Sequence, residues 1–518
     1  MLGLLLLWAA LATVAAGGFI QAEFYGPIPA SDFQPTGMSL SGGGSRSFIC
    51  SLGAFRGLHL LKVLPKVDYA SSVSGGSWAT AAFSYRDAKL ATVEEFLGEY
   101  VAPHRLGRVE LRLPIPKTCA LGFPVRLNLI MVLVKEIAQS RLEDVWTRSI
   151  HQVFLRPAGI SLTALPTLNN QTRAQVLARN PSLLNQVELL RVNPNQPIPI
   201  LNIALLGLSE DPDVAERNNR QYVMMHFTPT HVGLFQEQNL SYANNVAALR
   251  LGGGTIDPLG FGAQVPPQTV CGLQRCPVPQ VKPLPRPQHW FSIANATGAS
   301  SWAPGSLLVS YQHPAELLRL QTILLTCHYL SPKFAELGSR EVYVGDGENV
   351  ENQGLIALLQ LRARLVFMFI NTATPLTSTK LDSMMGVKIG RDVDTSFAAL
   401  FGYFTSSTSA TEDYSRDQVF ARKDLLVVMQ RLQLEAAKGN GAVTLYELET
   451  VENKWWGVPR GHKVRVVFNY LSRAFAWERA LPTHTWQAFG LEEERTDVLP
   501  SNGTFKRFPN LPISHPEG

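Results

Sequence analysis

One local pattern occurs twice in succession near the start of the chain and constrains the fold more than any other feature. Residues 37–40 form a short apolar run that leads into a glycine triplet at 42–44, after which apolar residues recur at helical spacing over 46–61. Residues 69–73 form a second apolar run, and the turn at 74–77 is followed by an alanine-rich helical stretch. Strand, tight turn and helix in alternation are typical of a parallel sheet covered by helices, so we predict the α/β fold class.

Later segments extend the predicted sheet. Apolar runs at 198–206, 221–227 and 365–370 are typical of strands, and 464–470 is typical of a late strand because its first residues alternate between apolar and polar. The segment 265–288 is dense in proline. We expect neither a helix nor a strand there, because proline lacks the backbone N–H donor and has a restricted φ.

The pattern between 107 and 195 is helical but irregular, which indicates a cap or insertion. A second glycine triplet at 252–254 has no strong helix after it, so we interpret it as a turn. We divide the chain into a signal segment (1–16), the first part of the α/β domain (17–106), the helical insertion (107–195), the rest of the α/β domain with its proline-rich loop (196–480, loop 265–288) and an irregular tail (481–518).

Composition excludes two classes of protein. The chain has 518 residues, of which 46% are hydrophobic, and this is enough for extensive buried cores and too much for a mostly disordered chain. Lys and Arg together number 46 and Asp and Glu 41, so the net charge of +5 is spread thinly over a long chain. No basic stripe with interleaved aromatic residues is present, and we expect no nucleic-acid partner.

The first residues of the chain have the features of a secretory signal. Residues 1–18 are apolar and carry no charged side chain, and Val14 and Ala16 fit the small-residue cleavage pattern of a signal peptide. We expect cleavage after Ala16 and a secreted protein, with an uncleaved membrane anchor as the alternative. Four Asn-x-Ser/Thr sequons are weakly in favour of secretion and begin at Asn170, Asn239, Asn295 and Asn502.

The chain has five cysteines, an odd number, so at least one is free of intramolecular pairing. Cys271 and Cys276 lie close together in the proline-rich segment and are the best candidates for a disulfide, with two free thiols as the alternative. No two cysteines have zinc-ligand spacing that a histidine pair completes, and we expect no metal site.

Ser74 is the first candidate for chemistry. A serine at a sharp strand-to-helix turn, followed directly by glycines, has the geometry of a nucleophile elbow. The usual first glycine of that motif is replaced here by Ser72, which is small enough for the same position. A serine-glycine turn alone is more often only a turn.

The triplet Gly42, Gly43 and Gly44 is the second candidate. Glycines ahead of a helix allow backbone N–H groups to converge on an anion, which is what an oxyanion hole requires. Arg46 adds a positive charge close by. A flexible connector is the alternative for the triplet, and a salt bridge at the helix start is the alternative for Arg46.

The third candidate is Asp346, which is followed by Gly347. It ends a strand-like run at 342–344 and precedes an apolar helical stretch at 355–361. An Asp at a strand end can accept the proton of a serine, but its ordinary pKa is too low for an efficient base at neutral pH. We therefore expect Asp346 to be buried or closely coupled to Ser74. Three such elements in one chain, in this order, indicate acyl-transfer chemistry.

In these motifs the chain resembles patatin-like and cytosolic-type phospholipase A enzymes. The resemblance is carried by the segment 42–46, by Ser74 with Trp78 after it, and by Asp346 with Gly347. Segments 227–233 and 298–301 resemble the cytosolic-type and lysophospholipase (phospholipase B) branch, and 351–355 and 508–510 are weaker matches. Two departures are Ser72 and the Gly345 that precedes the aspartate.

The resemblance implies a three-layer sheet flanked by helices and a Ser–Asp dyad without histidine. Ser74 would be the nucleophile and Asp346 the base, with the glycine triplet as the oxyanion hole and Arg46 as a phosphate-binding or charge-balancing residue. It also implies a phospholipid or lysophospholipid substrate at a membrane surface and no cofactor. The cytosolic enzymes carry an upstream calcium-dependent docking domain. The catalytic motif begins too soon after residue 16 for one, so calcium is not implied.

Three alternatives stay open at this point. A Ser–Asp–His triad would recruit His462 or His484, which follow Asp346 in the required order but lie in no recognisable motif. The same dyad could pass its acyl group to an alcohol or a second lipid, which would make the protein a transacylase. The fold could also serve as a non-catalytic lipid-binding module, which the intact Ser74 and Asp346 disfavour.

Overall fold

The computed structural model describes most of the chain. The expected signal segment, Cys271, Cys276 and Asn502 lie outside the described residues, and so does most of the expected tail. The three described cysteines, Cys50, Cys119 and Cys327, are free thiols. The described residues are 18–26, 33–107, 118–126, 128–139, 144–209, 222–240, 249–267, 280–303, 325–378, 380–404 and 412–488.

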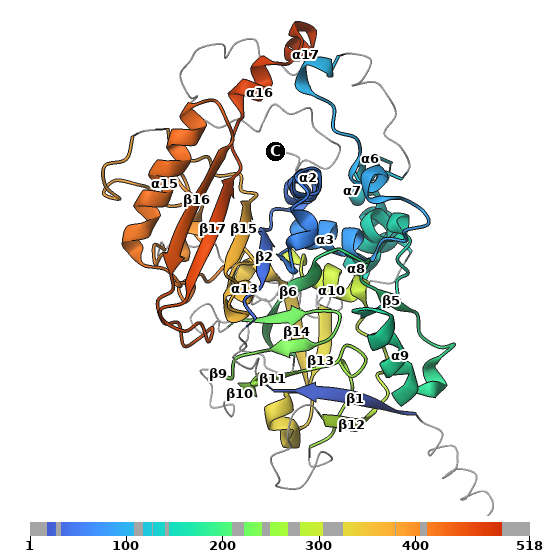
Figure 1. The fold of residues 1–518 in the computed structure, drawn as a ribbon. Coiled ribbons are helices and arrows are strands. Elements are labelled where there is room, and N and C mark those ends of the chain that lie inside the picture. Colours follow the sequence, from blue (N-terminus) through green and yellow to red (C-terminus); the bar gives the residue numbers. More distant parts are fainter. Residues whose placement is uncertain are drawn as a thin grey trace, which may run out of the picture.

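The fold is mixed α/β with one large central sheet and helices on its two sides (Figure 1). The sheet follows the order β12-β1-β11-β8-β7-β6-β3-β2-β15-β17-β16, and β14 pairs with both β6 and β13. The strands are β1 (Phe19–Tyr25), β2 (Thr36–Leu40), β3 (Tyr69–Ser72), β6 (Ile198–Leu208), β7 (Val223–Phe227), β8 (Val232–Leu234), β11 (Gly254–Ile256), β12 (Gln280–Pro285), β13 (Leu325–Tyr329), β14 (Arg340–Asp346), β15 (Leu365–Ile370), β16 (Ala442–Glu449) and β17 (Lys463–Tyr470). Two small sheets pair β4 (Leu165–Thr167) with β5 (Leu189–Arg191) and β9 (Gln238–Leu240) with β10 (Leu249–Leu251).

The helices precede or follow these strands in the alternation that the sequence predicts. The α-helices are α2 (Gly44–Leu60), α3 (Gly75–Tyr85), α4 (Val93–Leu97), α6 (Gly122–Arg126), α7 (Leu129–Ala138), α8 (Val145–Ile150), α9 (Asn170–Arg179), α10 (Ile293–Ala299), α13 (Ile356–Gln360), α14 (Thr395–Ala399), α15 (Arg422–Ala437), α16 (Phe475–Arg479) and α17 (Thr483–Ala488). A π-helix, η3 (His151–Leu155), continues α8, and short 3₁₀ turns include η9 (Gly347–Asn349) directly after β14.

The predicted strand–helix–strand–helix start is confirmed. β2 and β3 pair in parallel, as do β3 with β6, β2 with β15, and β15 with β17. β2 is buried along its whole length, as expected for a parallel strand with helices on both faces. The remaining pairs of the sheet are antiparallel, so the parallel core is extended by antiparallel strands on both sides.

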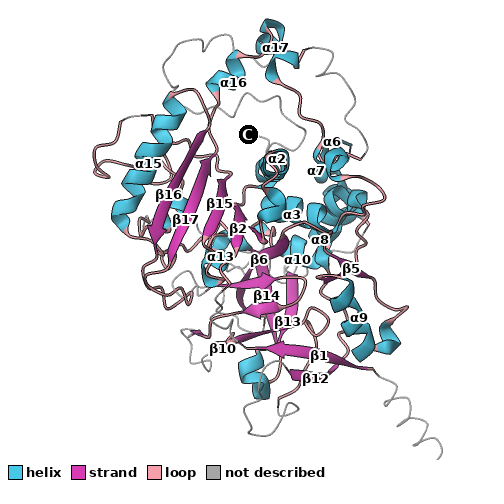
Figure 2. Cartoon of the chain, viewed as in Figure 1, coloured by secondary structure: helices cyan, strands magenta, loops and turns pink. Residues whose placement is uncertain are grey.

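Alternate residues of β6 enter two different hydrophobic cores. Leu201, Ile203 and Leu205 pack in the core that includes side chains of α2, α3, α8 and η3. Ala204 and Leu206, which point to the other face, pack in the core that includes α13, α14 and α15. The sheet therefore lies between two helical layers, which Figure 2 shows as strands with helices on both sides.

The segment expected to be a helical insertion contributes α6, α7, α8, α9 and the small β4–β5 sheet. Its side chains Phe123, Ile150 and Phe154 lie in the same core as α2 and α3. Its separation from the rest of the fold as a cap stays a prediction. The triplet 252–254 forms the expected turn: Gly252 and Gly253 join β10 to β11 with φ of 76° and 68°, and Gly254 begins β11.

The expectation for the proline-rich segment is wrong in its described C-terminal part. β12 pairs antiparallel with β1 over six residues, with Pro283 opposite Gln21 and Pro285 opposite Phe19. β12 is the last strand in the sheet order, so one of its edges has no partner among the strands that the structure describes. Prolines two residues apart can direct their missing N–H toward that open edge, which is where a sheet tolerates proline.

The ends of two strands meet along β6. β3 runs parallel to the first part of β6, and its last residue, Ser72, lies opposite Leu201. β14 runs antiparallel to the second part, and its last residue, Asp346, lies opposite Ile203. The chain segments that follow β3 and β14 are therefore brought together at the middle of β6.

Candidate active site

Ser74 occupies the sharp turn between β3 and α3. Its φ of 52° and ψ of −124° are unusual for a residue with a side chain, and it is buried. Its backbone N–H donates to the carbonyl oxygen of Ser300 at 3.0 Å, which holds the turn against the end of α10. The structure thus contains the strained strand-to-helix turn that a nucleophile elbow requires, and the role of Ser74 as a nucleophile stays a prediction.

The serine that replaces the usual first elbow glycine is fully buried and hydrogen-bonded. The hydroxyl of Ser72 lies 3.3 Å from that of Ser77 and 3.4 Å from the carbonyl oxygen of Ile200. The Ser77 hydroxyl lies 2.8 Å from that of Ser300, which in turn donates to the carbonyl oxygen of Asn202 at 2.6 Å. The hydroxyl of Ser72 therefore takes part in a buried hydrogen-bond network and is not left unpaired.

The glycine triplet packs directly against the elbow. A Cβ atom on Gly75 would lie 1.9 Å from the carbonyl oxygen of Gly44, so only glycine fits directly after Ser74. Gly43 and Gly44 have φ of 128° and 56°, and among the described residues no oxygen accepts a hydrogen bond from either amide. These two N–H groups, at the start of α2, are available to an anion.

Gly42 does not have the role that the sequence suggests. Its N–H donates to both the backbone oxygen and the side-chain Oδ1 of Asn352, at 3.0 and 2.8 Å, and is therefore unavailable to an oxyanion. A Cβ atom on Gly42 would lie 2.2 Å from Asn352 Oδ1 and 3.0 Å from Ser74 Cβ. Gly42 thus allows the loop to approach the nucleophile, and the expectation of a third donor is wrong.

Asp346 accepts a hydrogen bond from Ser74. The Ser74 Oγ donates to Asp346 Oδ2 at 2.9 Å, and both residues are buried. The other carboxylate oxygen, Oδ1, accepts from the backbone N–H of Glu348 at 2.9 Å. The Ser300 carbonyl oxygen, which accepts from Ser74, also accepts from the N–H of Gly347 at 3.3 Å, so one residue ties both catalytic candidates together.

The carboxyl group of Asp346 is buried, and its ionised form is therefore poorly solvated. Burial is the main cause that raises the pKa of its carboxyl to about 7, and the charge of Glu412 raises it further. The hydrogen bonds from Glu348 N–H and from Ser74 oppose this shift. Burial, followed by the charge on Asp346, also raises the pKa of Glu348 to about 8. Asp346 can therefore bind and release a proton near neutral pH.

Arg46 lies against the glycine triplet. Its Nε donates to the carbonyl oxygen of Asn371 at 2.9 Å, and its guanidinium lies beside Gly43. The side chain is partly exposed and makes no ion pair with a described residue. Its charge counteracts the rise in the pKa of Glu348. The alternative of a salt bridge at the start of the helix is therefore not what the structure contains.

Sequence reasoning did not assign roles to Asn352, Ser300 and Asn202. Asn352 and Ser300 lie in the segments 351–355 and 298–301, and the resemblance of these segments to the phospholipase family was the only sequence feature that indicated a role for them. Asn202 donates from Nδ2 to the Ser71 hydroxyl at 2.9 Å and to the Ser72 carbonyl oxygen at 3.0 Å, beneath the elbow. Nothing in the local sequence of β6 marks it as part of this site.

No histidine contacts the pair among the described residues. His462 Nε2 lies 2.9 Å from the carbonyl oxygen of Ala363, and the hydrogen bonds of Ser74 and Asp346 involve neither His462 nor His484. His226 contacts Asn202 beneath the elbow, because its Nδ1 lies 2.8 Å from Asn202 Oδ1. Burial lowers the pKa of His226 to about 3, so it supports Asn202 as a neutral ring.

Within the described ranges, no group of three or more His, Cys, Asp or Glu side chains could hold a metal ion. Among the helices that the structure describes, none has both the length and the apolar character needed to cross a membrane.

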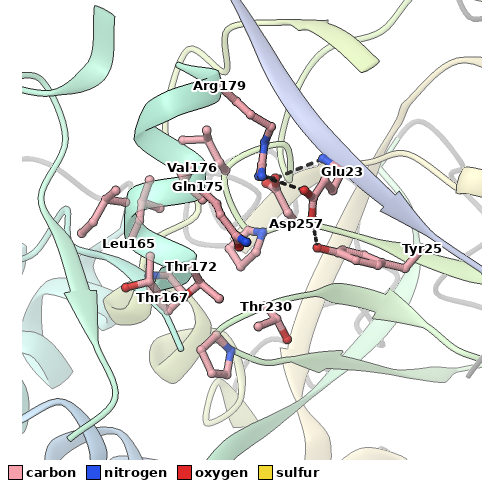
Figure 3. A pocket seen from close by; sticks show the side chains of 15 residues that line it. Glu23, Tyr25, Leu165, Thr167, Thr172, Gln175, Val176, Arg179, Thr230 and Asp257 are labelled. Carbon is pink, nitrogen blue, oxygen red and sulfur yellow. Dashed lines mark hydrogen bonds and ion pairs between the residues drawn. The ribbon is translucent and has the colours of Figure 1, made fainter. Parts of the chain in front are cut away.

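A polar hollow of about 490 Å³ lies apart from Ser74 and Asp346, between α9, β1 and the turn after β7 (Figure 3). Arg179 donates there to Glu23 at 2.6 Å and to Asp257 at 3.2 Å, and the Tyr25 hydroxyl donates to Glu23. One arginine faces two carboxylates there, so the hollow is net negative when both are ionised, and each of the three charged groups already has a partner within the protein.

Comparison with known proteins adds little to this geometry. No family model matches the chain, and no curated protein matches it. The matching solved structures include human GIVD cytosolic phospholipase A2, which is 14% identical, with a TM-score of 0.36 over 66% of this chain and 46% of that one. They also include the same human enzyme in complex with methyl gamma-linolenyl fluorophosphonate and terbium chloride, at 16% identity and a TM-score of 0.30 over 67% of this chain and 42% of that one. The chain spans less than half of the length of these structures.

Proposed function

We propose that the protein is a lipid acyl hydrolase that cleaves carboxylic esters of phospholipids or lysophospholipids through an acyl-enzyme on Ser74. One observation carries the hydrolase part: the elbow hydroxyl of Ser74 donates at 2.9 Å to the buried carboxylate of Asp346. The lipid substrate is supported by the sequence resemblance of segments 42–46, 298–301 and 351–355 to phospholipases.

In the acylation step, Ser74 Oγ attacks the ester carbonyl carbon while Asp346 Oδ2 accepts the Oγ proton. The carbonyl oxygen becomes an oxyanion, which the amides of Gly43 and Gly44 are available to bind. Such donors each contribute roughly 3–4 kcal/mol in hydrolases from which one has been removed. The intermediate then collapses, the bond from the carbonyl carbon to the alcohol oxygen breaks, and the departing alcohol takes the proton from Asp346.

The acyl-enzyme is released by the same groups in reverse. A water molecule attacks the acyl carbon and transfers a proton to Asp346, and the oxyanion again lies at the Gly43 and Gly44 amides. Breakage of the carbon–Oγ bond returns the proton from Asp346 to Ser74 and releases the fatty acid. A carboxyl whose pKa is about 7 can both accept and donate the proton, because its ionised and protonated forms are both well populated at neutral pH.

Fatty-acid release from diacyl phospholipid and from lysophospholipid tests this function directly. We expect release by the purified protein, equal with and without a chelator, since every proposed catalytic group belongs to the protein. Failure to release fatty acid from either lipid would contradict the proposal. Adding a long-chain alcohol to the same assay separates hydrolysis from transacylation, because a transacylase forms the new ester in place of free acid.

We also propose that the protein enters the secretory pathway and loses residues 1–16. The proposal rests on the apolar, uncharged start of the chain. N-terminal sequencing of protein from its native source should find a new terminus after Ala16. Recovery of intact Met1 would contradict cleavage.

A further inference from the structure

Helix α7 presents an apolar face to solvent. Ile130, Met131, Val134 and Ile137 are each about half or more exposed and follow one another on a single face at helical spacing. The helix is well defined, because the Asn128 side chain caps its start by accepting from the Ile130 N–H at 2.9 Å. A contiguous exposed apolar face of this kind marks an interaction site on a soluble protein.

The one acidic side chain of α7 lies on the buried side of the helix together with apolar side chains. This residue, Glu136, is buried and pairs with Arg148 of α8 at 2.8 Å, and its Oε1 accepts from Gln152. Leu129 and Val132 pack beside it in the protein core. The charge of Glu136 is therefore satisfied inside the protein, while four apolar side chains of the same helix remain exposed to solvent.

We infer that the α7 face, defined by Ile130, Met131, Val134 and Ile137, docks the protein on a phospholipid bilayer. This inference rests on the proposed lipid hydrolase function. The only exposed charge on α7 is that of Lys135, which lies at the border of the apolar face. Apolar side chains at the acyl boundary with a cation at the level of the phosphates are the arrangement of an interfacial helix.

A second copy of the chain fits this face less well. A stable interface between proteins buries roughly 800 Å² on each partner. A helix of ten residues is only about 15 Å long and cannot supply that area alone. A bilayer sets no such minimum, and the positive charge of Lys135 complements lipid phosphates.

The α7 face is linked to the turn at Ser74 through α8. Arg148 and Val145 belong to the helix on which α7 packs, and so does Trp146, whose Nε1 donates to the Ser301 hydroxyl at 3.1 Å. Ser301 follows Ser300, whose carbonyl oxygen accepts from the N–H of Ser74. A lipid surface bound at α7 would thus lie against the same layer that supports the elbow.

Vesicle binding tests the inference. In a Ser74→Ala background, which leaves the lipid intact, we expect the double variant Met131→Ser, Val134→Ser to bind phosphatidylcholine vesicles roughly tenfold more weakly by cosedimentation. Leu434→Ser on α15 is the matched control, since Leu434 is 64% exposed and Met131 66%. Lys135→Glu should weaken binding to vesicles containing phosphatidylglycerol more than to phosphatidylcholine alone.

Activity separates failure of the inference from failure of the proposed function. With Ser74 intact, the α7 double variant should lose activity on vesicles but keep it on a soluble short-chain ester. Unchanged vesicle binding by that variant, or an equal loss in Leu434→Ser, would overturn the docking face. So would a change in the oligomeric state of the protein alone, which would make α7 an interface between copies. If docking is lost as expected but no lipid is hydrolysed by the parent, only the proposed function fails.

Discussion

Ser74 Oγ and Asp346 Oδ2 lie 2.9 Å apart although 272 residues separate them in the chain. The contact follows from the way β3 and β14 approach each other along β6, with Ser72 opposite Leu201 and Asp346 opposite Ile203. Ser74 lies in the turn that follows β3, and Asp346 is the last residue of β14, directly before the 3₁₀ turn η9. A rigid sheet therefore positions the pair before any substrate arrives.

Removal of either member of the pair should abolish hydrolysis. Ser74→Ala removes the nucleophile and Asp346→Asn removes the proton acceptor while keeping its shape, so each should reduce kcat by about three orders of magnitude or more. His462→Ala should keep most of the activity, because His462 bonds to the Ala363 carbonyl oxygen instead. Rates of fatty-acid release from variants with an unchanged thermal melt decide this. A folded His462→Ala as inactive as Ser74→Ala would favour a triad.

The pH profile should report the ionisation of Asp346. Burial raises the pKa of this carboxyl to about 7, and only the ionised form accepts the Ser74 proton. We expect kcat/KM to rise with pH through about 7 and then level off. Glu412→Gln removes the carboxylate whose charge raises the pKa of Asp346 further, so it should move the rise to lower pH. An acid limb near the ordinary carboxyl pKa would contradict a buried base.

The same carboxyl should make folding stability depend on pH. Its pKa is higher in the folded than in the unfolded chain, so the folded state binds more protons between these two values. The contribution of Asp346 to stability is therefore greatest at low pH and is lost as the pH rises through about 7. Asp346→Asn cannot ionise, so its melting temperature should exceed that of the parent more at pH 8 than at pH 5. An equal difference at both pH values would exclude a raised pKa.

Replacement of Gly75 should disrupt the site, whereas the same change at Gly53 should not. An added methyl at residue 75 would overlap the Gly44 carbonyl oxygen, so Gly75→Ala must displace the elbow or the triplet and should cost about 1–3 kcal/mol of stability along with most of the activity. Gly53 lies in α2 with no heavy atom within 4 Å of the added Cβ, and Gly53→Ala should stabilise by about 0.5–1 kcal/mol. Chemical denaturation and fatty-acid release measure both effects. Wild-type activity in Gly75→Ala would contradict the close packing.

Arg46 should distinguish phosphate-bearing from neutral substrates. Its side chain makes no ion pair with a described residue, and Nε anchors it to Asn371. If the guanidinium binds the lipid phosphate, Arg46→Gln should raise KM for lysophospholipid roughly tenfold and leave a monoacylglycerol unaffected. Steady-state kinetics on the two substrates provide the test. An equal loss on both would mean that Arg46 acts by holding the Gly43 loop.

Local patterns in the sequence were sufficient to predict the elements on which the site is built. The strand–turn–helix units at β2–α2 and β3–α3, the elbow at Ser74 and the strand that ends at Asp346 all depend on neighbouring residues, through apolar periodicity and glycine turns. For that reason their positions can be read without knowing the rest of the chain.

Only the tertiary structure decided how these elements combine. The Ser74–Asp346 contact, the capture of the Gly42 amide by Asn352 and the pairing of proline-rich β12 with β1 join residues that are distant in sequence. The exposed apolar face of α7 likewise depends on the burial of Glu136 against Arg148. Such pairings are determined by the packing of whole strands and helices against one another. Local propensity does not determine which distant group an amide, a strand edge or a helix face contacts.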